Sequence, residues 1–304
     1  MLDVAAIAGE LAGCVSSAAL VRRDEPMARH TTLRVGGPAD LYVEPASEAD
    51  LAAVLQACRR RGADFFLLGR GSNLLVRDGG FRGVVICLAQ PEFSKIEFAG
   101  GRLRCGAGAR LKHVAQEARR NGLSGLEFLE GIPGSVGGGL RMNAGAMGGA
   151  MFDAVIAVRV MDYDGQVSEM APADMAVAYR GCATLKTRVA LAAELRGLPD
   201  SVESIAQRMS AFSQKRWSSQ PAAPSAGCMF KNPPAIPAGK LIDELGLKGA
   251  SVGGARVSQE HGNFLVNDGH ATAADVLALI SLLQARARAE RGVELHTEVE
   301  IIGE

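Results

Sequence analysis

Residues 131–149 read GIPGSVGGGLRMNAGAMGG, with glycine at eight of the nineteen positions. Each glycine costs backbone entropy and adds no packing, so the run predicts neither a regular helix nor a regular strand. Its apolar residues, among them Ile132, Val136 and Leu140, distinguish it from a polar flexible linker. We therefore predict a buried loop whose backbone N–H groups approach a ligand. A tight turn between packed elements is the alternative.

A second glycine loop, Gly69-Arg70-Gly71-Ser72-Asn73, follows the apolar run at 65–68. It is not the dinucleotide fingerprint G-x-G-x-x-G, because Leu74 stands where the third glycine belongs, and it lacks the Gly-Lys-Ser/Thr of a phosphate-binding P-loop. Ser and Asn donors between two strands still suit a diphosphate. Two such loops, about sixty residues apart, predict one extended ligand with a phosphate-bearing middle, such as a dinucleotide.

Composition excludes several classes of protein. The 304 residues suffice for two or three domains. The 33 basic and 33 acidic side chains give a net charge of zero, and aromatic residues make up only 5% of the chain, so we expect no nucleic-acid partner. The six cysteines lack C-x-x-C spacing and the histidines do not cluster, so no metal is expected. With no signal peptide and no apolar run of about 18–20 residues, we expect a cytoplasmic protein without membrane insertion.

Periodic patterns and turn signals predict an α+β protein in three parts. Capping boxes at 47–50 and 272–275 are expected to open two helices that end at Gly62 and Gly292. A hairpin is expected at Asp164-Gly165, and the residues at 106–109 are expected to form a connecting turn. Residues 1–28, rich in Ala and Leu, are expected to form one or two short helices. Residues 29–198 are expected to form two lobes, about 29–95 and 96–198, with the ligand between them, and residues 199–304 a smaller C-terminal domain. Expected helices lie at 47–62, 110–120, 200–216, 240–246 and 272–291; expected strands lie at 41–43, 65–68, 84–88, 102–105, 153–163, 166–170, 263–267 and 293–302.

Six motifs, spread over nearly the full length, resemble those of the UDP-N-acetylenolpyruvoylglucosamine reductase family and occur in the family's order. The resemblance implies a two-lobed FAD-binding domain of the vanillyl-alcohol-oxidase (VAO) and p-cresol-methylhydroxylase (PCMH) type, followed by a substrate domain. About 47 residues separate Arg180 from Cys228, which indicates the family's shorter type. The motifs are RVGGPAD at 34–40, GRGSN at 69–73, residues 131–149, Tyr179-Arg180, SAGCMFKNP at 225–233 and EVEIIG at 298–303.

The resemblance also implies an activity, its cofactors and its partners. Members reduce UDP-N-acetylglucosamine enolpyruvate to UDP-N-acetylmuramate, a step of bacterial peptidoglycan precursor synthesis, with non-covalent FAD as cofactor and NADPH as hydride donor. NADPH and then the enolpyruvate use the same cleft, and we expect a monomer. FAD contacts are implied for Gly69, Arg70, Gly71, Ser72, Asn73, Gly131, Pro133, Gly134, Ser135, Gly138, Asn143, Ala144 and Gly145, and substrate contacts for Tyr179, Gly227, Lys231, Asn232 and His261.

Cys228 is the first of three residues implied to be catalytic. By itself, a Cys between Gly and Met is more often a packed residue than a catalytic one. In the family this position is usually Ser, whose hydroxyl protonates the substrate carbanion. A thiol, with an unperturbed pKa of about 8.5, is the stronger proton donor, so the role survives the exchange. Unlike Ser, an open thiol is susceptible to oxidation.

Arg180 and Glu298 complete the implied catalytic set. Arg180 matches the Arg that contacts the enolpyruvyl carboxylate, for which a guanidinium is a natural bidentate partner. Glu298 matches the Glu that polarises the enolpyruvyl group together with that Arg. It lies on the polar face of the expected strand 293–302, where Glu294 and Glu300 are expected to be solvated. We expect the substrate carboxylate to raise the pKa of Glu298, which a pH–rate profile of Glu298→Gln against the parent tests.

Three other classes of protein remain as alternatives. An FAD-dependent oxidase of the VAO/PCMH superfamily, acting on an alcohol or a sugar, would reoxidise its reduced flavin rapidly in air. A nucleotide-binding module without turnover would purify with FAD that NADPH never bleaches. A protein that only binds partners would carry no flavin at all, which the two glycine loops make the weakest of the three.

Overall fold

The computed structural model describes residues 4–304 and divides them into two compact units. The first unit comprises the described residues up to Arg23 together with Leu41–Arg70 and Gly83–Gln214. The second comprises Asp24–Asp40, Gly71–Arg82 and Lys215–Glu304. Both units mix helices and strands, which confirms the predicted α+β class. None of the helices in residues 4–304 has the length and apolar character to cross a bilayer.

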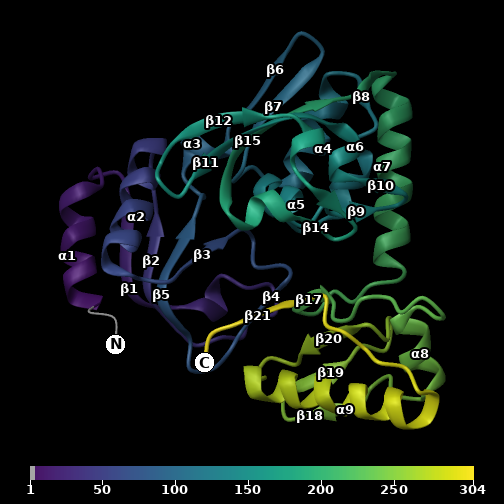
Figure 1. The fold of residues 1–304 in the computed structure, drawn as a ribbon. Coiled ribbons are helices and arrows are strands. Elements are labelled where there is room, and N and C mark those ends of the chain that lie inside the picture. The colour runs from purple at the N-terminus through teal and green to yellow at the C-terminus, as the bar shows by residue number, and fades with distance from the viewer. Residues whose placement is uncertain (1–3) are drawn as a thin grey trace. The chain divides into compact units, whose positions relative to one another are not determined.

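A four-stranded sheet in the order β1-β2-β5-β3 belongs mainly to the first unit. Strand β3 runs parallel to β5, with Phe65 opposite Val84. Helices α1 and α2 pack side by side on this part of the molecule (Figure 1). The elements are β1 Leu20–Pro26, β2 Pro38–Glu44, β3 Phe65–Leu68, β5 Phe81–Cys87, α1 Val4–Cys14 and α2 Glu48–Arg61.

Strand β1 corrects the expectation of a helical segment over residues 1–28, of which the first three lie outside the described residues. Helix α1 forms as expected, but Leu20–Pro26 joins the edge of the sheet beside β2. Sheet pairing therefore overrides what local composition predicted, as is common for strands.

Helix α2 begins and ends where the sequence predicts. Ser47 Oγ accepts a hydrogen bond from Asp50 N (3.1 Å), and Gly62 ends the helix with φ +60°. The expected capping box is only half formed, because the Asp50 carboxylate accepts hydrogen bonds from other backbone N–H groups and not from that of Ser47. It accepts from Ser16 N (2.8 Å) and Ala46 N (3.0 Å), which ties α2 to the segment after α1.

The rest of the first unit is built on a five-stranded antiparallel sheet in the order β12-β11-β15-β7-β6. The predicted Asp-Gly hairpin joins β11 to β12. Helices α4 and α5 gather on one side of the sheet (Figure 1), where they share its core. The elements are β6 Ile96–Ala99, β7 Arg102–Gly106, β11 Val155–Asp162, β12 Val167–Met170, β15 Arg188–Arg196, α4 Leu111–Arg120, α5 Val136–Arg141 and α6 Met151–Ala154.

Shorter elements complete the first unit. They are α3 Pro91–Ser94, β8 Leu123–Ser124, η2 Glu127–Gly131, β9 Gly145–Ala146, β10 Gly149–Ala150, η3 Pro172–Asp174, β13 Val177–Ala178, β14 Gly181–Cys182, η4 Ala183–Lys186 and β16 Leu198–Pro199. Helix α7, Val202–Trp217, follows them.

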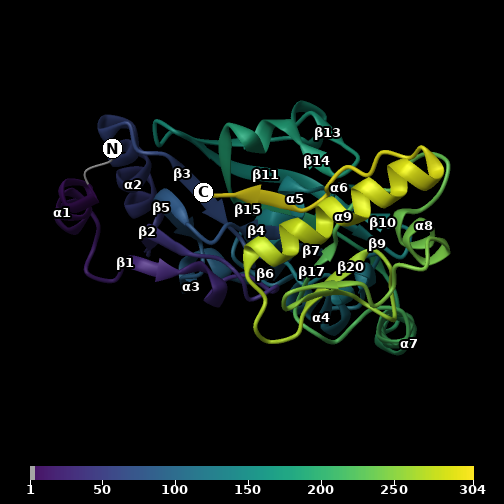
Figure 2. The same ribbon diagram turned by 90° about the horizontal axis from the view of Figure 1, so that it is seen from below.

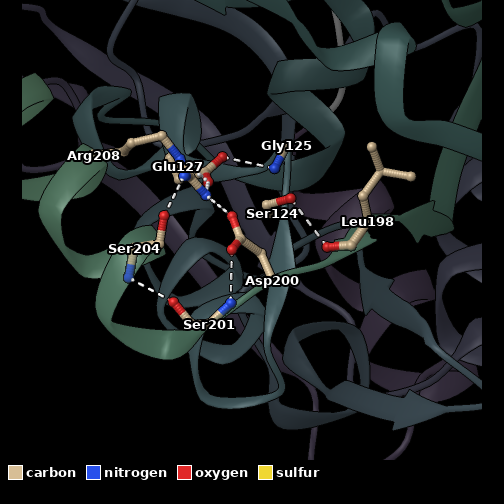
Figure 3. Close-up of polar contacts among 8 residues, drawn as sticks. All are labelled: Ser124, Gly125, Glu127, Leu198, Asp200, Ser201, Ser204 and Arg208. Carbon is tan, nitrogen blue, oxygen red and sulfur yellow. Dashed lines mark hydrogen bonds and ion pairs between the residues drawn. The ribbon is translucent and has the colours of Figure 1, made fainter.

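Arg208 of α7 ties this helix to the segment that leads into the glycine run (Figure 3). Its guanidinium donates to Glu127 Oε1 (2.8 Å), Asp200 Oδ2 (2.6 Å) and Ser204 Oγ (2.8 Å). The Glu127 side chain is only 6% exposed and also accepts from Gly125 N (2.7 Å). A buried carboxylate needs such hydrogen-bond partners, so Arg208 fixes the start of η2.

We expect Arg208→Met to lower the urea midpoint at pH 7, and the deficit to shrink in acid. The hydrogen bond from Arg208 lowers the pKa of Asp200 below its ordinary value of 3.8. A lowered carboxylate pKa stabilises the fold above 3.8, and this contribution is lost as pH falls through the folded-state value. Urea unfolding at pH 7 and pH 3 measures both effects, with exposed Arg196→Met as the control. A deficit that stays constant between the two pH values would contradict the prediction.

The second unit packs helices α8 and α9 against a sheet in the order β17-β20-β19-β18. Figures 1 and 2 both show α9 lying along this sheet. The predicted capping box of Thr272 and Asp275 opens α9, and Gly292 ends it. The elements are η1 Met27–Arg29, β4 Leu74–Val76, β17 Ser225–Cys228, β18 Ser251–Val252, β19 Ala255–Val257, β20 Phe264–Asn267, β21 Glu300–Ile302, α8 Ala238–Glu244 and α9 Ala273–Arg291.

The expected strand at 293–302 is much shorter in the structure. Only β21 is a strand, and it pairs in parallel with β4. Before it, Thr297 forms a single bridge with Phe230. The alternation in the sequence arises because Leu295 and Val299 are buried in the core of the second unit, not because residues 293–299 form a ladder.

Gly71 is a position in this unit where a side chain does not fit. Its φ is +60°, and an added Cβ would lie 2.1 Å from His30 O. Gly100 has nearly the same φ, +58°, but a Cβ added there would have no atom within 4 Å. Both glycines therefore share the conformational cost of a left-handed residue, and only Gly71 adds overlap.

We expect Gly71→Ala to lower the free energy of unfolding by about 1–3 kcal/mol more than Gly100→Ala does, the usual cost of overpacking. Urea unfolding of the parent and the two variants measures the difference. If both variants lose the same free energy of unfolding, the backbone around His30 shifts to make room for the added methyl group, which contradicts the prediction.

Candidate active site

A cavity of about 510 Å³ opens in the first unit at the carboxyl ends of the parallel strands β3 and β5. Residues 67–70 and 86–89 line one side. The turn at 107–110 and the start of α5 line another, and residues from 185–190 close a third. Residues from both predicted ranges, 29–95 and 96–198, therefore line the cavity.

The two glycine loops meet at this cavity. Gly69 and Arg70 come from the first loop, and Ser135 and Gly138 from the second. A Cβ added to Gly69 would lie 3.0 Å from Ser135 Oγ and 3.8 Å from Gly138 Cα. A side chain at position 69 would press against Ser135, and the close approach puts both loops within reach of a single ligand.

Four arginines line the cavity: Arg70, Arg110, Arg141 and Arg188. Burial and the nearby charge of Arg110 lower the pKa of Arg70, a cost that a bound anion would relieve. Arg141 is oriented by a hydrogen bond from its Nη1 to Leu185 O (2.7 Å). Cationic groups beside apolar walls suit a ligand that carries a diphosphate between ring systems.

Sequence reasoning missed Arg110, Arg141 and Arg188. One signal was present: the turn Gly106-Ala107-Gly108-Ala109, interpreted only as a connection. A Cβ on Gly108 would lie 1.8 Å from Leu88 O, so this turn approaches the strand end as closely as glycine allows. A third glycine-containing turn at the same cavity is the feature that would have extended the prediction.

The central run contains a helix, which corrects the expectation of a wholly irregular loop. Helix α5 begins after Ser135, whose Oγ accepts from Gly138 N (3.3 Å). Added Cβ atoms at Gly137 and Gly139 would lie 3.2 Å from Ala107 Cβ and 3.3 Å from Leu111 Cδ1. The glycines therefore favour close packing against the turn before α4 and against Leu111, the first residue of α4, and this packing offsets their low helix propensity.

The second half of the run supports Arg180. Asn143 accepts from Phe152 N (3.2 Å) and donates to Ala178 O (3.3 Å). Gly145 O accepts from Arg180 Nη1 (3.5 Å). Arg180 itself has a φ of +56°, rare for a residue with a side chain and frequent at functional sites. Its Cζ lies 5.2 Å from the ring centre of Tyr179, which is 72% exposed.

In the second unit, the segments that carry Cys228 and Glu298 are hydrogen-bonded neighbours. Cys228 ends β17, after Gly227, whose φ of +78° favours glycine. The next residue, Met229, accepts from Glu298 N (2.8 Å) through its carbonyl. On the other side, Asn73 Nδ2 donates to Glu298 O (3.2 Å). Two of the three predicted catalytic residues thus share one backbone framework, and Arg180 belongs to the first unit.

The remaining predicted substrate residues also lie in the second unit. Lys231 is exposed, and Asn232 accepts from Ala238 N (3.1 Å) at the start of α8. His261 Nδ1 accepts from Asn263 N (3.1 Å), and burial together with Lys248 lowers the pKa of His261, so the ring is neutral at pH 7. Predicted FAD contacts that do not line the cavity are Gly71, Ser72 and Asn73 in the second unit and Gly131, Pro133, Gly134, Asn143, Ala144 and Gly145 in the first; these contacts stay predictions.

Two protein families match the chain in consecutive segments. Residues 39–171 match the family described as an FAD binding domain. Residues 220–302 match the family described as the C-terminal domain of UDP-N-acetylenolpyruvoylglucosamine reductase. The first match contains most of the cavity, and the second contains Cys228 and Glu298.

Curated relatives and solved structures agree with these matches. The UDP-N-acetylenolpyruvoylglucosamine reductase of Heliobacterium modesticaldum is 47% identical over 93% of this chain and 90% of its own length. That of Moorella thermoacetica is 41% identical over 100% and 99%. The crystal structure of the Thermus caldophilus enzyme superposes with a TM-score of 0.83 at 41% identity, covering 94% of this chain and 100% of its own. A berberine bridge enzyme variant shares the fold alone, with a TM-score of 0.51 at 14% identity over 64% of this chain and 43% of its own.

Proposed function

The chain belongs to the UDP-N-acetylenolpyruvoylglucosamine reductase family, and we propose how its residues share the work of the family's reaction. It is an FAD-containing, NADPH-dependent oxidoreductase that reduces UDP-N-acetylglucosamine enolpyruvate to UDP-N-acetylmuramate for peptidoglycan synthesis. Bound FAD supplies the hydride relay from NADPH to the enolpyruvyl double bond. The protein supplies binding, orientation and protons.

We propose that residues 29–198 hold FAD and residues 199–304 hold the substrate. The cavity between β3, β5 and α5 supports the first assignment, because both glycine loops and four arginines line it. Gly69, Ser135 and Gly138 allow close approach of the backbone, and Arg70 offers charge to the diphosphate. This cavity is the observation that carries the cofactor assignment.

The proton chemistry is assigned to Cys228, Arg180 and Glu298. Cys228 donates a proton from Sγ to C2 of the substrate after hydride has reached C3. Arg180 pairs with the substrate carboxylate and stabilises the negative charge that develops beside it. Glu298 polarises the enolpyruvyl group together with Arg180. The hydrogen bond between Glu298 N and Met229 O supports a common framework for the acid and the polarising carboxylate.

An anaerobic experiment tests the proposed function as a whole. The purified yellow protein is reduced with NADPH, UDP-N-acetylglucosamine enolpyruvate is added, and the flavin spectrum is followed. We expect the oxidised spectrum to return with formation of UDP-N-acetylmuramate. If the flavin bleaches but the enolpyruvate does nothing, the substrate and the three catalytic assignments are wrong. If the reduced flavin is instead reoxidised rapidly when air is admitted without the enolpyruvate, an oxidase is favoured.

We also propose that the enzyme works as a cytoplasmic monomer. Six cysteines without C-x-x-C spacing support a reducing compartment, where structural disulfides are rare. Sedimentation velocity tests the monomer, and a mass that doubles at micromolar concentration would overturn it.

A further inference from the structure

Asn73 contacts the segment that carries Glu298 at two points. Its side-chain Nδ2 donates to Glu298 O (3.2 Å), and its backbone O accepts from Glu300 N (3.1 Å). Strands β4 and β21 pair in parallel from Leu74 and Glu300 onward. The amide of Asn73 therefore adds one more bond to the ladder, one step before the first paired residues. It fixes the peptide plane that follows Glu298.

The other side of Glu298 is held as well. Glu298 N donates to Met229 O (2.8 Å), and Met229 N donates to Asn263 O (2.8 Å). Met229 directly follows Cys228 and is fully buried. With both backbone polar groups of Glu298 engaged, the direction of its Cα–Cβ bond is set by Asn73 on one side and by the Cys228 segment on the other.

The loop that carries Asn73 is held by hydrogen bonds to neighbouring segments. Thr32 N donates to Gly71 O (3.1 Å), and Thr32 Oγ1 donates to Ser225 O (2.6 Å) at the start of β17. An added Cβ at Gly71 would overlap His30 O, so the backbone has little room to shift there. The loop that carries Asn73 is thus fastened to the strand that carries Cys228, and it has the rigidity that a positioning group needs.

We propose that Asn73 is a positioning residue for Glu298, in place of the cofactor contact that its motif implies. The inference rests on the proposed function, because it assigns Asn73 to the step in which Glu298 acts. Asn73 touches no reacting atom in this role. It keeps the Glu298 carboxylate in the geometry that polarises the enolpyruvyl group, and a displacement of about 1 Å there costs up to about 100-fold in rate.

The test measures the two halves of the reaction separately in the FAD-loaded enzyme. For Asn73→Ala we expect parental flavin content and an unchanged rate of flavin reduction by NADPH. We expect flavin reoxidation by the enolpyruvate to slow about 10- to 100-fold. Asn73→Gln, which keeps an amide donor, should recover part of that loss. A loss of flavin, or an equal slowing of both halves, would assign Asn73 to cofactor binding and overturn the proposal.

A double-mutant cycle with Glu298→Gln decides whether Asn73 acts through Glu298. In that background the Glu298 carboxylate is gone, so Asn73→Ala should cost less than about 3-fold in reoxidation rate. Full additivity of the two losses would overturn the proposal. If Asn73→Ala does not fold, Asn73→Asp, which has the same shape but no N–H donor, replaces it in the cycle. Failure of the parent enzyme to be reoxidised by the enolpyruvate would instead remove the proposed function, a result read without any Asn73 variant.

Discussion

In Cys228→Ala, NADPH should reduce the flavin at the parental rate, but transfer of the hydride from the flavin to the enolpyruvate should be impaired. General acid catalysis by a positioned group contributes about 10²- to 10⁴-fold, so we expect flavin reoxidation by the enolpyruvate to slow by that factor. Cys228 is half-buried at the end of β17, and the Gly227 backbone before it has a φ that other residues rarely adopt. The position of the thiol is therefore set by the strand, and removing the thiol leaves no group in its place.

Cys228→Ser is the matched variant. A hydroxyl occupies the same position and is the usual group in the family, so we expect most of the turnover to remain. The two variants should also differ in sensitivity to oxidation, because only the parent has a thiol to lose. Mild peroxide treatment should slow the parent and spare Cys228→Ser, with exposed Cys14→Ala as a control that stays sensitive. Normal turnover in Cys228→Ala would eliminate Cys228 as the acid.

Local signals in the sequence predicted much of the fold. Ser47 and Thr272 cap their helices, and Gly62 and Gly292 end the same helices in the left-handed conformation, as their positions predicted. The Asp-Gly turn between β11 and β12 was equally clear. These features depend on a few neighbouring residues, so they are readable without knowledge of tertiary contacts.

The errors lie where distant residues decide the local structure. Residues 20–26 form a strand because β2 offers them an edge. Helix α5 forms in a glycine run because Ala107 and Leu111 pack where side chains would otherwise lie. Residues 293–299 alternate in polarity because Leu295 and Val299 enter a core, without forming a ladder. In each case the local structure depends on a contact with residues distant in the chain, and the local sequence pattern does not identify those residues.

The sequence predicted the type of site, a ligand shared by two glycine loops, but not all of the residues that line it. Glycine loops far apart in sequence indicated a shared ligand, and the structure brings Gly69 against Ser135. The arginines at 110, 141 and 188 carried no comparable signal, because an Arg in a turn, a helix end or a strand start is ordinary. The hydrogen bond between Asn73 and Glu298 was also hidden, since Glu298 lies 225 residues further along the chain.

Arg180→Lys should slow flavin reoxidation by the enolpyruvate about 10²- to 10³-fold, the usual cost of removing one donor to a developing negative charge. Lys keeps the positive charge but lacks the planar fork that pairs with both oxygens of a carboxylate. The left-handed backbone at this position is strained by either side chain, so strain does not explain a difference between them. Lys also loses the contact of the guanidinium with Gly145 O and the stacking on Tyr179 that orient it.

The two half-reactions separate this role from a structural one. Flavin content and flavin reduction by NADPH should match the parent, because Arg180 is assigned to the enolpyruvyl carboxylate, which NADPH lacks. The KM for the enolpyruvate should rise together with the fall in kcat, because the same guanidinium binds the ground-state carboxylate and stabilises the enolate that develops from it. Arg196→Lys, an exposed change in the same unit, should alter neither half. If Arg180→Lys loses flavin or is reduced slowly by NADPH, the assignment fails, and Arg180 becomes a residue that holds the cofactor.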